Sequence, residues 1–268
     1  MTRRTFATGL FLLPVLRAEQ SESQKRGKEL IDRCIQALGG PAFLNMQDRL
    51  ETGRAYSFYR ERLSGLSIAR LYSRYVEPPN PAPESYNGML ERQAFGKKQD
   101  SAVLFNEDGG FEVTFRGARP LPDDTVNKHR ESVLTNFLYI VRQRLREPGI
   151  GFEARGIEVV ENQRVNAVDV FDNANRTITV YLSADTGLPV RQRYMRFDPM
   201  YKEKIEELTH FANFRDAGGG AMWPADIQRE RDGEKIYQMF SDSITVSNNF
   251  DPNLFQLPSG MKMLKKNS

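Results

Sequence analysis

The sequence predicts a mainly β, α+β fold in which short antiparallel strands form the sheet and two helices accompany it. From about Leu50 onward, apolar and polar residues alternate at a period of two, the spacing of a strand with one buried face. Gly, Asp and Asn turns separate these segments, which are short and rich in aromatic, Val and Ile residues. Such segments favour antiparallel pairing with one wet face. Helical spacing occurs before residue 39 and again between residues 123 and 148.

The composition excludes several other protein classes. Apolar residues make up 39% of the 268-residue chain before its 20 glycines are counted, a normal content for a packed globular protein. One cysteine cannot pair within the chain, so a disulfide scaffold is excluded. The length permits one large all-β domain or two small ones, and the absence of a break in composition favours one.

Residues 1–18 have the pattern of an export signal. Arg3 and Arg4 precede an apolar stretch that is too short to cross a bilayer, which needs about 20 residues, and Ala18 is the expected last residue removed. The arginine pair, with a phenylalanine two residues on, favours a twin-arginine signal, and an ordinary Sec signal is the alternative. We therefore expect export to the periplasm, with residues 19–268 as one domain.

The basic residues of this signal account for the whole net charge of +3. Removing Arg3, Arg4 and Arg17 from 38 basic side chains leaves 35, against 35 acidic ones. A neutral mature chain has no global positive field to attract nucleic acid or anionic lipid. No cysteine follows the apolar stretch and no later window reaches about 18 apolar residues, so we expect a soluble protein with no lipid anchor.

Two helices are predicted. The first runs from a cap at Ser21 or Ser23 to about Leu38, where two glycines stop it. The second is a single long helix from a cap within 123–125 to the Pro-Gly pair at 148–149. Its apolar stripe is wide and must lie against something hydrophobic.

Eleven or twelve strands are expected, followed by a closing turn at Asp251–Leu257 that tucks Leu254 and Phe255 inward. A sheet of this size must close or nearly close on itself to hide its edges. Above about eight strands, a barrel leaves an interior that side chains need not fill. The long helix then either covers a ligand cavity or completes an ordinary core. The expected strands are Leu50–Tyr59, Leu66–Tyr75, Met89–Phe95, Ala102–Asn106, Phe111–Arg116, Gly156–Val160, Val165–Phe171, Thr177–Leu182, Pro189–Phe197, Glu203–Phe214, Trp223–Glu230 and Lys235–Val246.

No motif for catalysis or for a metal is present. His129 and His210 lie far apart and lack metal-ligand spacing, and Cys34 falls on the apolar stripe of the first helix, as a buried, inert thiol would. The chain has no nucleophile elbow, phosphate loop or dinucleotide-binding turn. We expect no catalytic residue, no metal site, no cofactor and no enzyme activity. An enzyme built from paired carboxylates stays the least favoured alternative, since only geometry defines such pairs.

Four segments, taken in order, resemble the LolA/LolB superfamily of periplasmic lipoprotein-handling proteins, many of them described as outer membrane lipoprotein-sorting proteins. The resemblance implies an open antiparallel half-barrel with helices as a lid, and an apolar hollow that holds the acyl chains of a lipoprotein in transit between membranes. No binding residue carries over by motif. The segments are Ala37–Pro41, the strand Thr179–Leu182 with the turn Asp185–Arg191, Ala221–Pro224, and Asp251–Phe255.

The expected function is therefore a periplasmic carrier or binder of lipoproteins or other acylated molecules. Its expected partners are acyl chains and a membrane-bound transporter or receptor protein, with no nucleic acid, and the protein is expected to be a monomer. The alternative is an envelope sensor or protein-interaction module with the same fold and no lipid cargo. In either case each predicted cavity residue could instead belong to a plain core. These residues are Val133, Phe137, Ile140 and Val141 on the helix and Tyr56, Phe58, Ile68 and Tyr72 on the early strands.

Overall fold

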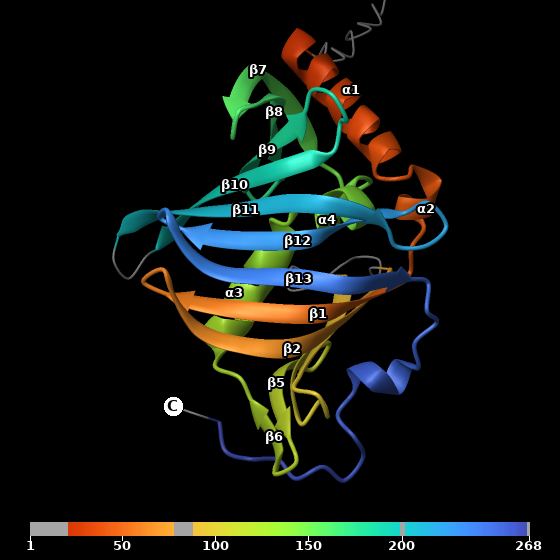
Figure 1. Ribbon diagram of the computed structural model, residues 1–268, viewed down its shortest axis with the longest axis vertical. Coiled ribbons are helices and arrows are strands. Elements are labelled where there is room, and N and C mark those ends of the chain that lie inside the picture. Colours follow the sequence, from red (N-terminus) through yellow and green to blue (C-terminus); the bar gives the residue numbers. More distant parts are fainter. Residues whose placement is uncertain (1–20, 78–87, 199–201, 267–268) are drawn as a thin grey trace, which may run out of the picture.

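In the computed structural model, which describes residues 21–77, 88–198 and 202–266, one antiparallel sheet of thirteen strands dominates. The spatial order is β6-β5-β4-β3-β2-β1-β13-β12-β11-β10-β9-β8-β7, so β6 and β7 are the two edges and the sheet stays open (Figure 1). This confirms the predicted open antiparallel half-barrel, with thirteen strands rather than about eleven. The strands are β1 (Asp48–Tyr59), β2 (Arg62–Tyr75), β3 (Met89–Phe95), β4 (Ser101–Asn106), β5 (Gly109–Thr114), β6 (Gly117–Pro120), β7 (Gly151–Val160), β8 (Gln163–Phe171), β9 (Thr177–Ser183), β10 (Pro189–Asp198), β11 (Glu203–Asp216), β12 (Met222–Arg231) and β13 (Glu234–Val246).

The first helix, α1 (Glu22–Ala37), begins as the sequence predicts. Ser21 forms a capping box with Gln24, whose backbone N–H donates to the Ser21 hydroxyl at 3.2 Å. The chain then leaves the helix through Gly39, which has φ of +109° and lies so close to the Gly220 carbonyl that a Cβ would clash. The helix packs along β7 and β8, and the short α2 (Pro41–Leu44) follows it.

The predicted long helix over 123–148 is wrong in one respect, because the structure breaks it in the middle. It consists of α3 (Asp123–Leu134), a break at Thr135 and Asn136, α4 (Phe137–Tyr139) and the π-helical turn η1 (Ile140–Arg144). Asn136 starts α4 as a new helix, since its side chain accepts a hydrogen bond from the Tyr139 N–H at 3.1 Å. Apolar residues keep helical spacing across the break, so periodicity alone predicts a continuous helix.

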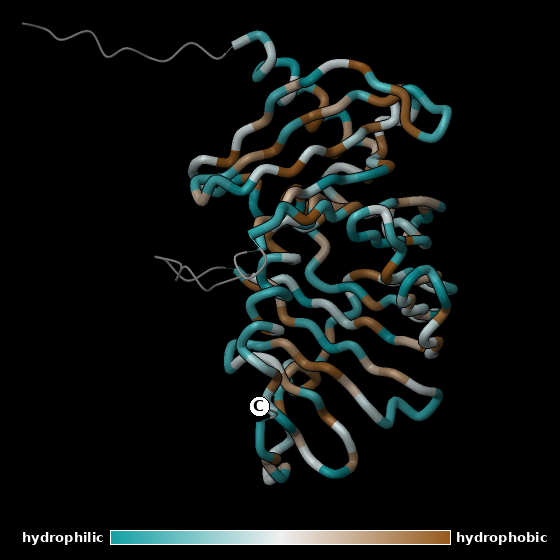
Figure 2. Tube along the Cα trace, turned by 90° about the vertical axis from the view of Figure 1, so that its left-hand side faces the viewer, coloured by the Kyte–Doolittle hydropathy of each residue, from teal (hydrophilic) through white to brown (hydrophobic). Residues whose placement is uncertain are grey.

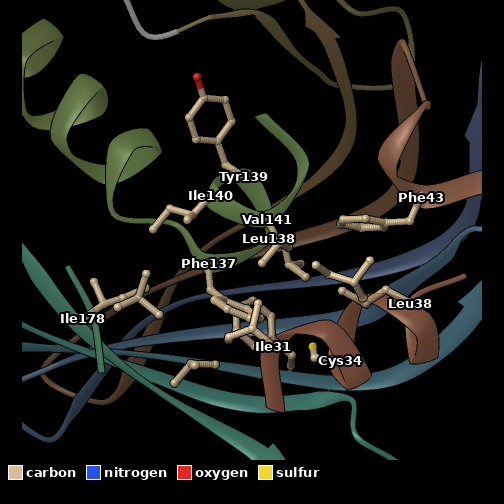
Figure 3. Packing of buried hydrophobic residues seen from close by; sticks show 14 of the residues in the cluster. Ile31, Cys34, Leu38, Phe43, Phe137, Leu138, Tyr139, Ile140, Val141 and Ile178 are labelled. Carbon is tan, nitrogen blue, oxygen red and sulfur yellow. The ribbon is translucent and has the colours of Figure 1, made fainter. Parts of the chain in front are cut away.

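The main core lies where α1, α2, α4 and η1 meet the sheet (Figure 3). Phe137 and Val141 point from the broken helix toward Ile31 and Cys34 of α1, and Phe43 of α2 closes the group. These five side chains are at most 1% exposed. This end of the half-barrel is therefore filled by the protein's own side chains.

The C-terminal segment covers the face of β2 to β6 that points away from α3. Its 3₁₀ turn η2 (Pro252–Phe255) places Phe255, which is fully buried, against the outward side chains of these strands, while Leu254 is half-buried. The segment then runs beside β6, where the Ala118 N–H donates to the Lys262 carbonyl at 2.9 Å and the Leu264 N–H donates back at 2.8 Å. One sheet edge is thereby protected from pairing with another chain.

Hydrophobic and hydrophilic residues alternate along the strands when the molecule is viewed from the side (Figure 2). The sheet therefore presents two distinct faces, one toward α3 and the core and one outward. No helix in the described ranges combines the length and apolar content that crossing a membrane requires. The predicted export signal, residues 1–18, lies outside the described residues.

Candidate functional site

Two cavities lie between the sheet and α3, one on each side of the helix. Their volumes are about 350 and 310 Å³. Five residues border both cavities: His129 and Ser132 from α3, Asn136 from the break before α4, and Arg229 and Ile236 from β12 and β13. The α3 end of the half-barrel is therefore hollow, in contrast to the filled core beside α1 and α4.

The larger cavity has a mixed lining. Its apolar wall consists of Leu71, Met89, Phe95, Val133, Leu138, Trp223, Ile227, Ile236 and Met239. Its polar wall consists of Arg49, Glu51, Tyr75, Glu91, Gln93, His129, Ser132, Asn136, Tyr139, Arg229 and Tyr237. A ligand with an apolar body and a polar end fits such a lining better than a purely aliphatic one does.

The smaller cavity, on the β10–β11 side of α3, is richer in charge. Charged side chains in its wall already have oppositely charged neighbours: Arg196 lies 3.2 Å from Glu207, and Glu131 lies 3.8 Å from Arg176. Glu131 also accepts a hydrogen bond from the Tyr194 hydroxyl at 2.5 Å. Burial raises the pKa of Tyr194, and the bond to Glu131 adds to that effect. This cavity is held together by internal polar contacts, so we assign the candidate ligand site to the larger one.

A buried ion pair forms the floor of the larger cavity. The Nε of Arg49 lies 2.8 Å from Glu51 Oε1, and the guanidinium also donates to Tyr75 Oη at 2.9 Å and to Ser73 Oγ at 3.1 Å. The same guanidinium lies 3.8 Å from the ring centroid of Trp223, a close cation–π contact. Although burial opposes its charge, these neighbours raise the pKa of Arg49 above its ordinary value. The pair is fully engaged and leaves no charge free for a ligand.

His129 lies where α3 faces both cavities. Its ring stacks on Phe105 with centroids 3.5 Å apart and planes 6° from parallel. Burial lowers the pKa of His129, an effect that Glu91 opposes and Arg229 strengthens. The Nε2 atom is inaccessible to solvent and has no hydrogen-bond partner among the described residues. Burial therefore favours the neutral form of this histidine.

The structure offers no arrangement for metal chemistry in the described ranges, where no three His, Cys, Asp or Glu side chains group closely enough to hold an ion. His210 lies between Glu161, at 3.0 Å, and Glu230, at 3.3 Å, away from the larger cavity. Cys34 is fully buried in the main core, and its burial raises the pKa of the thiol far above the usual range. Neither residue contributes to the candidate site.

The predicted helix residues fall beside the larger cavity. Val133 lines it directly, whereas Phe137, Ile140 and Val141 are buried in the adjoining core, at most 4% exposed, and do not border it. Leu138, on the same short helix, borders the cavity in their place. The break before α4 turns Phe137, Ile140 and Val141 into the core, while α3, Leu138 and Tyr139 border the hollow.

The predicted strand residues lie on the outward face of the sheet. Tyr72 packs edge-on against Phe250 of the C-terminal segment, and Ile68 is exposed. Side chains alternate along a strand, so Leu71, Ala69 and Ala55 face inward while Tyr56 and Phe58 point out with Tyr72 and Ile68. These four aromatic and aliphatic residues do not border either cavity.

Sequence reasoning missed most of the cavity wall. Arg49, Glu51 and Arg229 were not predicted as cavity residues, because charged residues in strands are ordinarily solvent-facing. A usable signal is the phase of the strands, because the buried side chains Glu51, Ala69 and Ser73 all occupy odd positions. The phase of β2 could have been set from Ala69 and Ser73, small residues suited to the crowded inner face.

Solved structures with a similar fold were found at low sequence identity. A domain described as an outer membrane lipoprotein-sorting protein, from Vibrio parahaemolyticus, superposes with a TM-score of 0.56 at 14% identity, covering 87% of this chain and 97% of that one. A DUF1329 family protein from Desulfovibrio piger gives a TM-score of 0.57 at 13% identity, covering 88% and 98%. No protein-family model matches the sequence, and no curated protein matches it. The comparisons thus show a shared LolA-like fold over nearly the whole described chain.

Proposed function

We propose that the protein is a periplasmic binder or carrier of acylated molecules, holding an acyl chain in the larger cavity beneath α3. The observation that carries this proposal is the 350 Å³ hollow itself, which falls within the usual size of small-ligand sites, about 300–1,000 Å³. Nine apolar side chains line it, Val133 of the predicted set among them. The shared fold with a lipoprotein-sorting domain supports the proposal.

Binding in such a site is driven by removing apolar surface from water. Each buried CH₂ contributes about 0.8 kcal/mol, which corresponds to about a fourfold gain in affinity. Affinity should therefore rise along a series of fatty-acyl probes of growing length. The affinity should stop rising once the acyl chain fills the space beside the apolar wall formed by residues such as Leu71, Phe95 and Met239.

The test is a titration of purified protein with that series, together with native mass spectrometry for a co-purified ligand. Leu71→Phe, which extends into the larger cavity, should weaken binding of the longest probes. Leu66→Phe is the matched control, since Leu66 lies on the same strand but on the outward face and is 59% exposed. Affinity that does not depend on chain length, or equal effects of the two variants, would argue against acyl binding in this cavity.

Export to the periplasm is part of the proposal and is supported by the Arg3-Arg4 pattern of residues 1–18. Replacement of both arginines by lysine should leave the protein in the cytoplasm if the signal is of the twin-arginine type. Continued export would favour the Sec route, and a wild-type protein found in the cytoplasm would refute the location.

A protein-interaction module is the second candidate, and one observation favours it. The β1–β2 hairpin exposes a group of large apolar side chains: Tyr59, Leu63, Leu66 and Ile68 are 66, 57, 59 and 39% exposed. Contiguous exposed apolar side chains are typical of docking surfaces. Recovery of one stoichiometric protein partner that Leu66→Asp abolishes, from protein that binds no acyl probe, would favour this reading.

A further inference from the structure

One cation at the candidate site lacks a counter-charge. Of the basic residues that line the two cavities, four have a carboxylate within 4.0 Å: Arg49 with Glu51, Lys128 with Asp124, Arg196 with Glu207, and Arg231 with Glu207. Arg229, the fifth, has none among the described residues. It is half-buried on β12 and borders both cavities, facing α3 across the space where they meet.

The hydrogen-bonding capacity of Arg229 is largely unused. A guanidinium carries five N–H donors, and this one makes a single long contact, from Nη1 to Ser132 Oγ at 3.4 Å. The Tyr237 ring centroid is 6.0 Å away, at the outer limit of a cation–π contact. The remaining donors are free to bind a guest, and a planar fork of donors matches the oxygens of a carboxylate or phosphate.

The other charged groups of the larger cavity direct an anion to the same place. The charge of Arg49 is already compensated by Glu51 at 2.8 Å, and its guanidinium also donates to Tyr75 and Ser73. Glu91, on the β3 wall, is a negative charge that accepts a hydrogen bond from Gln93 and repels an anion. An oxyanion is therefore favoured at the β12 side only.

We propose that the ligand is an acyl amphiphile with an anionic head, a carboxylate or phosphate bound by Arg229, while its chain lies along the apolar wall of the larger cavity. The inference rests on the proposed acyl-binding function and specifies its ligand class. It implies that the head group, and not chain length alone, decides which lipids bind. A hydrogen-bonded charge pair of this kind changes affinity by about ten- to a hundredfold.

The experiment compares probes of one chain length that differ only in the head: a fatty acid, an alkyl phosphate and a fatty alcohol, each titrated by calorimetry. Wild-type protein should bind at least one of the anionic probes about ten- to a hundredfold more tightly than the alcohol. Arg229→Gln should remove that difference by weakening the anionic probes far more than the alcohol, and its far-ultraviolet circular dichroism spectrum, compared with that of wild type, shows whether the variant is folded. Arg229→Lys, which keeps the positive charge but loses the planar set of guanidinium donors, should retain part of the affinity difference between the anionic probes and the alcohol.

Arg193→Gln is the matched control, because Arg193 is an arginine on the outward face of β10 that pairs with Glu206 at 3.6 Å. It should bind all three probes as wild type does. The anionic probe that loses more affinity in Arg229→Gln identifies the head as carboxylate or phosphate. Equal binding of acids and alcohol by wild type would overturn the inference while leaving acyl binding intact; no binding of any probe would overturn the proposed function.

Discussion

Removing the charge of Arg49 should lower the free energy of unfolding, and the expected size of that loss follows from the contacts of Arg49. Arg49 and Glu51 are 7 and 2% exposed, and the guanidinium donates to Glu51, Tyr75 and Ser73 within 3.1 Å. Arg49→Met keeps most of the side-chain volume over Trp223, but it leaves the buried Glu51 carboxylate without its cationic partner. Breaking a buried pair in this way costs about 3–5 kcal/mol.

The double variant Arg49→Met/Glu51→Met tests whether the cost of Arg49→Met comes from the unpaired Glu51 carboxylate. With both charges gone, no ion is left without a partner, and replacing a buried pair by apolar residues is often close to neutral. We therefore expect the double variant to regain at least about 2 kcal/mol of the stability that Arg49→Met loses. Lys25→Met, which breaks the exposed helix pair with Glu22 at 3.3 Å, should cost at most about 1 kcal/mol.

Urea unfolding followed by far-ultraviolet circular dichroism measures all three differences. Fluorescence of Trp223, the single tryptophan, is unsuited as the only probe because Arg49 lies directly over its ring. If Arg49→Met proved as mild as Lys25→Met, or if the double variant were less stable than the single one, the account of the pair as a desolvated, mutually dependent unit would be refuted.

Three further predictions concern groups outside the cavity floor or at its rim. Arg144→Met should cost more in urea unfolding than the exposed Arg155→Met, which should cost at most about 1 kcal/mol, because Arg144 bonds Asp172 at 2.8 Å inside the core. Arg176 still pairs with Asp172 in that variant, so the loss should stay below the roughly 3–5 kcal/mol of a buried carboxylate left without any partner. Burial alone would raise the pKa of Asp172, but Arg144 and Arg176 lower it, so this stability should be lost as pH falls through that lowered pKa. Burial lowers the pKa of His129 below 6.5, so the unfolded chain takes up the proton first and the free energy of unfolding should fall as pH drops below about 6.5. This fall should be steeper in wild type than in His129→Gln, and parallel curves of unfolding free energy against pH would show that the histidine is not buried in its neutral form. Cys34 should react with a thiol reagent only as fast as the protein unfolds, and rapid labelling of the native protein would contradict its burial.

Most of the fold could be predicted because local chemistry and final structure agree along the strands. The hairpin of β4 and β5 joins two strands that the sequence predicts as Ala102–Asn106 and Phe111–Arg116, and Ser21 caps α1 as the sequence predicts. The short edge strand β6 was missed because Gly117 and Pro120 make a poor strand sequence, and its pairing depends on β5 and the distant C-terminal segment. Such long-range partners are invisible to periodicity.

The site was harder to predict because it depends on strand phase. Tyr72 and Ile68 of β2 match Tyr75 and Leu71 in size and apolar character, but their phase is outward. The C-terminal segment that covers Tyr72 lies some 180 residues along the chain. The inward positions carry Leu71 and Tyr75 instead. Charged residues on the inner face, such as Arg229, become meaningful only when the positions of their neighbours are known, because an unpaired charge is a property of the assembled site.

The break at Thr135 and Asn136 explains why one end of the half-barrel is filled and the other hollow. Gln192 of β10 spans it, donating to the Thr135 carbonyl at 3.2 Å and accepting from the Phe137 N–H at 2.8 Å. After the break, the chain enters the main core, where Phe137 is fully buried. Before it, α3 buries only Val133 and Leu134 and otherwise meets the sheet through polar or stacked contacts. Displacing α3 therefore exposes little apolar surface compared with displacing α4, and elements with few buried contacts open first. We therefore expect α3, rather than α4, to be the wall of the cavity that opens first.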